Sequence, residues 1–91
     1  MTKRAEIKVL GSVQGVSFRY YTVEQAKKLG LLGFVRNEPG GSVQIIAEGE
    51  EENLKELVSW CYDGVKWAKV DEVKVKWAKV LGEFKEFDIR F

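Results

Sequence analysis

The sequence predicts a small α+β sandwich in which one mainly antiparallel sheet carries two helices on a single face. Three observations lead to this prediction. Five segments alternate apolar and polar residues as strands do, two space their apolar residues as helices do, and the order is β-α-β-β-α-β with a short strand added at the end. Because 91 residues suffice for one core, we expect residues 1–91 to form a single domain.

The first strand and the first helix flank a loop that is rich in glycine. Residues 5–13 alternate as a strand, with Ile7 and Val9 on one face. Residues 18–29 place apolar side chains at helical intervals, and Gly30 stands where a helix ends. We therefore expect a strand that leads through this loop into a helix.

The next two strands form a predicted hairpin. Residues 32–36 and 42–48 have strand-like patterns, and Pro39 and Gly40 lie between them, as is typical of a tight turn. Alternation along a strand places Arg36 and its neighbour Asn37 on opposite faces of the sheet, so we interpret Arg36 as surface charge.

The second half of the chain continues with a helix and two strands. The acidic run at residues 50–52 favours a helix start, and an apolar stripe that includes Cys61 predicts a buried helix face. Residues 73–77 alternate as a fourth strand, and residues 87–91 alternate as a short last one. The whole order is that of the split β-α-β, or ferredoxin-like, arrangement, which hosts many unrelated functions.

The composition narrows the possible partners. Fifteen basic and fourteen acidic residues leave a net charge of +1, which argues against a dedicated binder of nucleic acid or of membranes. No segment of the sequence approaches the roughly 20 apolar residues of a membrane span. We therefore expect a cytoplasmic protein with neither partner, and the many lysines and glutamates favour a thermophilic source.

The cysteine and histidine content restricts the chemistry. Cys61 is the single cysteine and the chain contains no histidine, so an internal disulfide is impossible and no convincing transition-metal site remains. We expect no metal and no other cofactor. Because Cys61 lies on the apolar helix stripe, we interpret it as a core residue.

The loop between the first strand and the first helix is the main candidate for a functional motif. It contains Gly11 and Gly15, and it delivers Arg19 at the first turn of the helix. Glycines let the backbone come close to a ligand, and amide groups at a helix start carry partial positive charge. A guanidinium group can meet two phosphate oxygens at once. The loop is therefore typical of an anion-binding site.

The loop is one of several characteristic runs along the sequence. These runs are Val13-Gln14-Gly15-Val16-Ser17-Phe18-Arg19, Gly33-Phe34-Val35-Arg36-Asn37, Gly41-Ser42-Val43 and Ala47-Glu48-Gly49. Together they resemble the acylphosphatase family, and the resemblance extends over essentially the whole chain. The resemblance implies that Arg19 binds the phosphate and that Asn37 positions a water molecule. It also implies that the phosphoryl oxygens meet the backbone amides of Gln14, Gly15, Val16, Ser17 and Phe18.

The resemblance further implies an enzyme that hydrolyses the carboxyl-phosphate bond of acyl phosphates without a metal ion. Water held by Asn37 attacks in line, and the products are a carboxylate and inorganic phosphate, which also binds as a competitor. A carboxylate leaves without a proton, so this chemistry needs no general acid and suits a chain without histidine.

Two alternatives stay open. A regulatory domain that binds phosphate or carbamoyl phosphate without turnover can keep the same loop. A nucleic-acid-binding module of the same fold can use lysines and aromatic residues. Its candidates here are Lys66, Lys69, Lys74, Lys76, Lys79, Trp60, Trp67 and Trp77. We interpret the tryptophans as packing residues, and we expect Glu38 to weaken substrate binding if its carboxylate points toward the phosphate.

Overall fold

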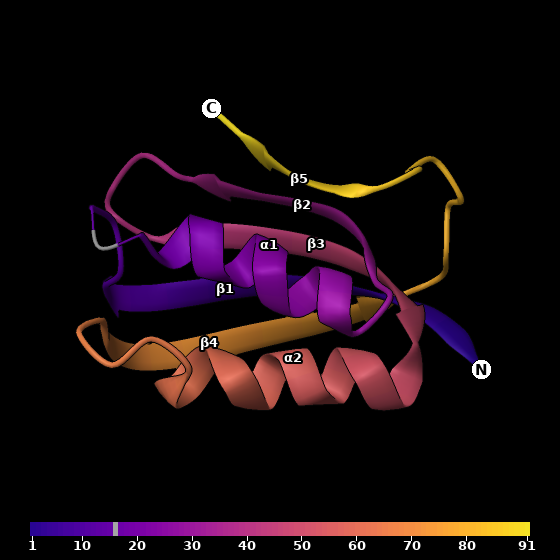
Figure 1. Cartoon of the computed structure of the whole chain (residues 1–91), viewed down its shortest axis with the longest axis horizontal. Coiled ribbons are helices and arrows are strands. Elements are labelled where there is room, and N and C mark those ends of the chain that lie inside the picture. The colour runs from indigo at the N-terminus through magenta and orange to yellow at the C-terminus, as the bar shows by residue number, and fades with distance from the viewer. Residues whose placement is uncertain (16) are drawn as a thin grey trace.

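The computed structural model describes every residue of the chain except Val16. Its elements are β1 (Thr2–Ser12), α1 (Phe18–Lys28), β2 (Leu32–Asn37), β3 (Val43–Glu50), α2 (Glu51–Asp63), β4 (Lys69–Ala78) and β5 (Phe87–Arg90), as Figure 1 shows. The predicted order of strands and helices is therefore confirmed.

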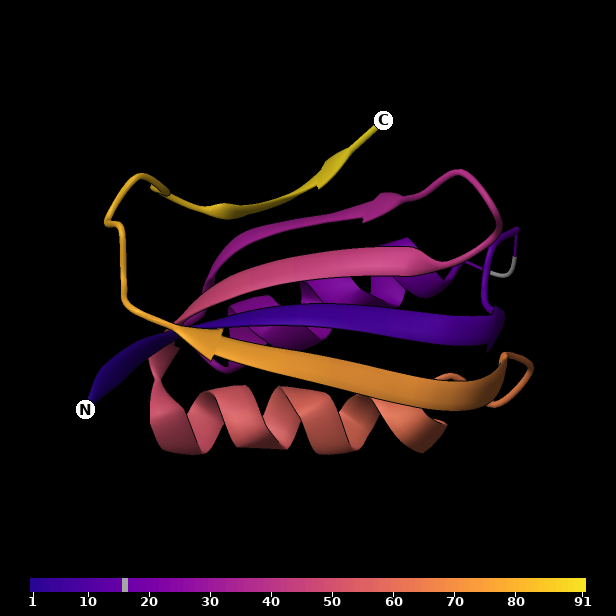
Figure 2. The same ribbon diagram turned by 180° about the vertical axis from the view of Figure 1, so that it is seen from behind.

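The five strands form one sheet in the order β4-β1-β3-β2-β5. Neighbouring strands are antiparallel except for β5, which pairs in parallel with β2 at the edge. Helix α1 packs over β2 and β5, and α2 packs over β1, β3 and β4 on the same face. Figure 2 shows the opposite face, which no helix of the described chain covers. The ferredoxin-like α+β fold is thus confirmed.

The core lies between the helices and the sheet. Ile7 and Val9 of β1 and Ile45 of β3 are fully buried, as are Leu54 and Leu57 of α2. The spacing of these residues explains the two layers. Every second residue of a strand lies on the same face of the sheet, and residues three or four apart on a helix lie on the side that faces the sheet. Neither helix in the described part of the chain is long and apolar enough to cross a membrane.

Strand β1 ends in a bulge that directs the chain toward α1. The register between β1 and β4 shifts between Leu10 and Gly11. Gly11 has a φ of 132°, and a Cβ atom there would lie 2.2 Å from the carbonyl oxygen of Lys69, so only glycine fits. Pairing continues past the bulge, and β4 therefore begins at Lys69 rather than at residue 73, as the alternation had indicated.

One of the three tryptophans is packed as expected. Trp60 on α2 is half-buried, with its ring centroid 5.7 Å from that of Phe18. Trp67 and Trp77 leave 60% and 41% of their surface exposed, so these two pack only in part; Trp67 meets the Tyr21 ring edge-on at 5.8 Å. The reason is their position, since Trp67 lies in the loop before β4 and Trp77 lies on β4, an edge strand.

Cys61 is a core residue, as expected. Its side chain is fully buried on α2. Burial raises the pKa of its thiol to about 12, because the thiolate would lose its hydration. The thiol therefore stays protonated and unreactive near neutral pH.

A buried carboxylate holds the connection between β4 and β5. Glu48 is 4% exposed and accepts hydrogen bonds from the backbone N–H groups of Leu81 (2.9 Å) and Gly82 (3.2 Å) and from the Arg4 guanidinium (3.1 Å). Burial alone raises the pKa of this carboxyl, but the three hydrogen-bond donors together outweigh burial and hold the pKa below its ordinary value. These contacts fix the segment that brings the chain to the opposite edge of the sheet (Figure 2).

We expect Glu48→Gln to destabilise the fold at neutral pH and to matter less in acid. Because the folded-state pKa lies below the unfolded value near 4.5, the ionised group contributes stability above that value, and the contribution is lost as the pH falls through the folded pKa. Loss of the negative charge from the buried Glu48–Arg4 pair should lower the free energy of unfolding by about 1–3 kcal/mol at pH 7. Urea unfolding between pH 7 and pH 2 measures the difference.

The matched control is Glu83→Gln, because Glu83 also lies near Arg4, at 3.6 Å, but is 57% exposed. Its substitution should change the free energy of unfolding by less than about 0.5 kcal/mol. A Glu48→Gln penalty that is the same at pH 7 and at pH 2 contradicts an ionised, hydrogen-bonded Glu48.

Candidate active site

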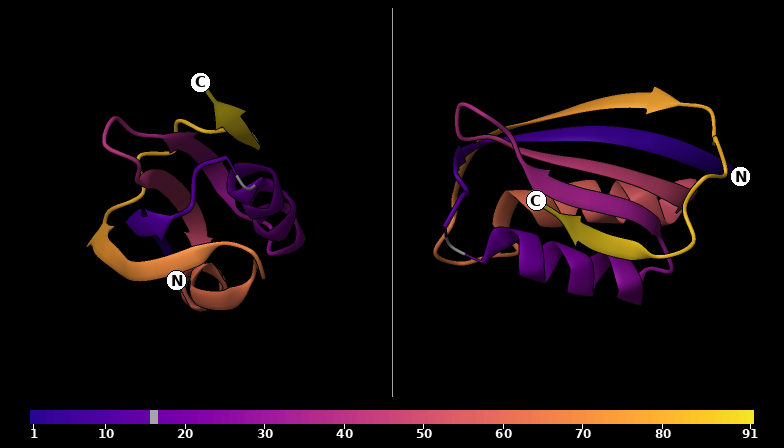
Figure 3. Two further views of the ribbon diagram at one scale, coloured as in Figure 1. Left: turned by 90° about the vertical axis from the view of Figure 1, so that its left-hand side faces the viewer. Right: turned by 90° about the horizontal axis from the view of Figure 1, so that it is seen from above.

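A pocket of about 350 Å³ lies where α1 begins and where β1, β2 and β5 end. Figures 1 and 3 show these ends on the same side of the molecule. The described residues that line it are Val13, Gly15, Ser17, Phe18, Arg19, Tyr20, Asn37, Ile89 and Phe91. The structure therefore brings Arg19 and Asn37 together, although a helix and a strand separate them in the sequence.

The start of α1 offers hydrogen-bond donors to this pocket. The hydroxyl of Ser17, the N-cap residue, makes no capping hydrogen bond to a described residue, and the described first turn contains no acidic side chain. The first backbone N–H groups of a helix have no acceptor within the helix, and the helix dipole makes this end positive. The helix start therefore attracts an anion, and Arg19 adds a full positive charge beside it.

The backbone before α1 is held in an unusual conformation. Gly15 has a φ of 76° and Ser17 has a φ of 62°, both in the left-handed region. For a residue with a side chain, as Ser17 has, this conformation costs roughly 1–2 kcal/mol. Successive turns of this kind direct backbone N–H groups into one concavity, which is a common way to bind phosphate. Val16, which the sequence also placed in this loop, lies outside the described residues.

Asn37 is the last residue of β2, and its carboxamide oxygen is unpaired. Among the described residues, Oδ1 of Asn37 is the one buried side-chain oxygen or nitrogen without a hydrogen-bond partner. Leaving a buried acceptor unpaired costs about 1–3 kcal/mol, so native proteins seldom retain one without a functional reason. A water molecule bound for reaction can supply the missing donor.

Gln14 ties the loop to the turn that follows Asn37. Its Nε2 donates hydrogen bonds to the carbonyl oxygens of Glu38 (2.9 Å) and Ser42 (2.8 Å). The same turn is closed by a hydrogen bond from the N–H of Glu38 to the carbonyl of Ser42 at 2.8 Å. Gln14 is not among the residues that line the pocket. Its two hydrogen bonds fix the distance between the loop and the turn that follows Asn37.

The last residue of the chain covers one side of Arg19. The guanidinium carbon of Arg19 lies 4.9 Å from the centre of the Phe91 ring. Phe91 follows β5, and the parallel pairing of β5 with β2 brings it toward Asn37, since Arg36 pairs with Arg90 in register. A ring against one face of a guanidinium leaves the N–H edges free to bind oxygen atoms.

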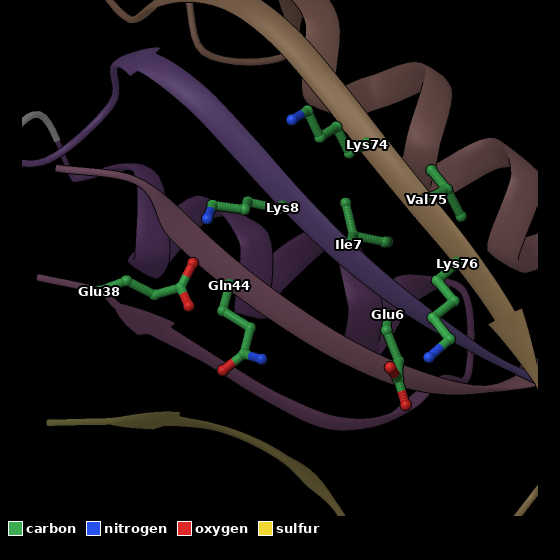
Figure 4. A pocket seen from close by; sticks show the side chains of 8 residues that line it. All are labelled: Glu6, Ile7, Lys8, Glu38, Gln44, Lys74, Val75 and Lys76. Atoms are coloured by element: carbon green, nitrogen blue, oxygen red, sulfur yellow. The ribbon is translucent and has the colours of Figure 1, made fainter. Parts of the chain in front are cut away.

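Glu38 points away from this pocket. Its carboxylate accepts a hydrogen bond from the Ser42 hydroxyl at 2.9 Å and lines a different hollow, of about 270 Å³, on the helix-free face of the sheet. In Figure 4, Glu38 and Lys8 point toward one another on that face. Arg36 lies on the same face of the sheet, as predicted from strand alternation. Its Nε donates a hydrogen bond of 2.6 Å to the side-chain oxygen of Gln44, which lines the hollow. The expected repulsion between Glu38 and a bound phosphate is therefore removed by orientation.

Several contributors to the site were not predicted from the sequence. They include Tyr20, Ile89, Phe91 and the side chain of Gln14. The alternation of residues 87–91 had placed Ile89 and Phe91 on one face, but nothing in the sequence placed their strand beside β2. The described residues contain no group of three or more His, Cys, Asp or Glu side chains that could hold a metal ion.

Known proteins resemble this chain over its whole length. Residues 5–89 match the family described as acylphosphatase. The acylphosphatase of Geobacter sulfurreducens is 47% identical over 91 residues, which cover 100% of both chains. The acylphosphatase of Caldanaerobacter subterraneus subsp. tengcongensis is 40% identical over 89 residues, which cover 98% of this chain and 99% of the relative.

Solved structures agree with this fold. The crystal structure of acylphosphatase from Bacillus subtilis superposes with a TM-score of 0.93 at 36% identity and covers 100% of both chains. Full-length HypF in its phosphate- and nucleotide-bound form gives a TM-score of 0.91 at 30% identity, with 100% of this chain but 12% of HypF covered.

Removing the Phe91 ring should weaken phosphate binding. We expect Phe91→Leu to raise the dissociation constant of inorganic phosphate by about 2- to 5-fold, because an exposed ring on a guanidinium contributes about 0.5–1 kcal/mol. Phe91→Trp should restore tight binding. Calorimetric titration with phosphate measures both, and unchanged affinity in Phe91→Leu would show that the ring does not support Arg19.

Proposed function

This chain belongs to the acylphosphatase family, and we propose that it hydrolyses acyl phosphates in the pocket beside the start of α1. One observation carries the proposal. The same pocket contains the uncapped helix start, the Arg19 guanidinium and the carboxamide of Asn37, which is the set of groups that phosphoryl transfer to water requires.

Binding uses the phosphate end of the substrate. We propose that the N–H groups of Gly15, Ser17 and Phe18 donate to the phosphoryl oxygens, and that Arg19 donates two further hydrogen bonds. Phosphoryl transfer places charge on the three equatorial oxygens in a loose transition state. Donors that are already oriented stabilise this charge without reorganising, and partial enclosure of the pocket makes each of them more effective than it would be in open water.

The attacking water is positioned from β2. Asn37 Oδ1 accepts one hydrogen of the water, which directs an oxygen lone pair toward phosphorus. The new P–O bond forms as the bond between phosphorus and the acyl oxygen breaks, and the bonding pair leaves with the carboxylate. The water proton passes to a phosphoryl oxygen, so the products are a carboxylate and inorganic phosphate, and no side chain has to donate a proton.

The similarity to a part of HypF is relevant to one alternative function, a phosphate-binding domain without catalytic activity. A domain of this fold can bind phosphate without turning over a substrate, and the helix start and Arg19 alone are sufficient for that. The unpaired Asn37 oxygen favours turnover, because phosphate binding has no use for an acceptor next to an anion. Hydrolysis therefore separates the two readings.

The helix-free face does not favour a nucleic-acid partner. Figure 4 shows Lys8, Lys74 and Lys76 interspersed with Glu6 and Glu38 around one hollow. A nucleic-acid track needs cations without intervening carboxylates, because it must neutralise successive phosphates. We therefore propose an enzyme that binds small acyl phosphates. We propose further that it forms a single domain, uses no cofactor and works in the cytoplasm.

We expect substitutions of Asn37 and of Arg19 to have different effects on turnover and on phosphate binding. Asn37→Ala should lower kcat for acetyl phosphate by about 10²- to 10³-fold and leave the inhibition constant of inorganic phosphate unchanged, because only the water loses its partner. Arg19→Ala should lose both turnover and phosphate affinity. Steady-state hydrolysis with phosphate as competitor, run with a chelator present, measures both quantities.

Arg36→Ala is the matched control, since Arg36 precedes Asn37 but lies on the opposite face of the sheet. It should keep the parent rate. The proposed role of Asn37 fails if Asn37→Ala hydrolyses acetyl phosphate as fast as the parent, and the metal-free proposal fails if the chelator stops the parent enzyme.

A further inference from the structure

We propose that Tyr20 forms the acyl-binding wall of the pocket, so that this chain prefers acyl phosphates whose acyl group is flat and apolar. This inference rests on the hydrolysis proposed above and extends it to the half of the substrate that leaves. Tyr20 lines the pocket and is 54% exposed, a large aromatic surface to leave in water beside a binding site.

Tyr20 lies on the outer side of α1. Phe18 and Thr22 are both buried against the sheet, and Tyr20 is two residues from each of them. A helix turns by about 100° per residue, so Tyr20 points to the side opposite these two, away from the sheet. Asn37, in contrast, belongs to the sheet itself. The pocket therefore has Asn37 on its inner wall and Tyr20 on its outer wall.

In-line displacement fixes which part of the substrate meets which wall. The attacking water and the leaving oxygen occupy opposite sides of the phosphorus atom. With the water at Asn37, the leaving carboxylate and the acyl group attached to it are directed outward, along the wall that Tyr20 forms. Geometry thus brings the acyl group to Tyr20 and keeps it away from Asn37.

The Tyr20 ring is held in place before substrate binds. Its centroid lies 5.3 Å from that of Tyr21 at an interplanar angle of 77°, and Tyr21 in turn meets Trp67 edge-on at 5.8 Å. The Tyr20 hydroxyl is hydrogen-bonded to Glu24, one helical turn further on, which raises the pKa of the hydroxyl. An oriented ring loses little entropy when a second flat group packs on it.

The chemistry of the lining selects an apolar acyl group. Arg19 has the one charged side chain among the described lining residues, and the phosphate would pair with it. A second carboxylate on the acyl chain would find no free cationic side chain among the lining residues, whereas an aryl or alkyl group would gain contact with Tyr20 and remove apolar surface from water.

The test compares one aromatic and one small substrate, benzoyl phosphate and acetyl phosphate. We expect Tyr20→Ala to lower kcat/KM for benzoyl phosphate by about 3- to 10-fold and to leave kcat/KM for acetyl phosphate within about 2-fold of the parent. The inhibition constant of inorganic phosphate should not change, because phosphate does not reach this wall. Tyr20→Phe keeps the ring and should keep the parent ratio of the two substrates.

Tyr62→Ala is the matched control, because Tyr62 is a tyrosine of similar exposure, 55%, on α2 and outside the pocket. This substitution should leave kcat/KM unchanged for both substrates. An unchanged benzoyl-to-acetyl ratio in Tyr20→Ala, or an equal loss for both substrates, overturns the role of Tyr20 while the proposed hydrolysis stands. A parent protein that hydrolyses neither substrate overturns the proposed function, and this inference with it.

Discussion

The uncapped start of α1 is the constraint on which the rest of the site depends. Its first amide groups have no acceptor within the helix, and the Ser17 hydroxyl does not cap them among the described residues. Such an end is stable only where an anion or water completes it. Just before the helix, Gly15 and Ser17 both have left-handed backbone conformations, which occur in backbone turns that bind anions through their amide groups.

The sheet order places the other groups around this helix start. Strand β2 lies between β3 and β5, so the end of β2 supplies Asn37, and the residue after β5 supplies the ring that covers Arg19. Gln14 sets the spacing between the loop and Asn37 through two hydrogen bonds to the β2–β3 turn. At the far end of the sheet, Glu48 fixes the segment before β5, which allows a four-residue edge strand to form a wall of the pocket.

Sequence reasoning reached the fold because each element has a local pattern, and it reached Arg19 and Asn37 because their runs resemble a family. It placed Arg36 correctly, since alternation along a strand is a local rule. It missed Phe91, because the pairing of an edge strand depends on partners far away in the chain. The exposed rings of Trp67 and Trp77 were missed for the same reason, as burial depends on which elements cover them. The buried Glu48 was missed because its donors, Leu81 and Gly82, lie in a segment without a secondary-structure pattern.

The most direct test of the anion site is a titration of ¹⁵N-labelled protein with inorganic phosphate, followed by nuclear magnetic resonance. We predict saturable shifts of the backbone amides of Gly15, Ser17 and Phe18 and of the Arg19 side-chain N–H, all with one dissociation constant. Saturating shifts that are centred on the lysines of the helix-free face, with these four signals unmoved, would contradict the account.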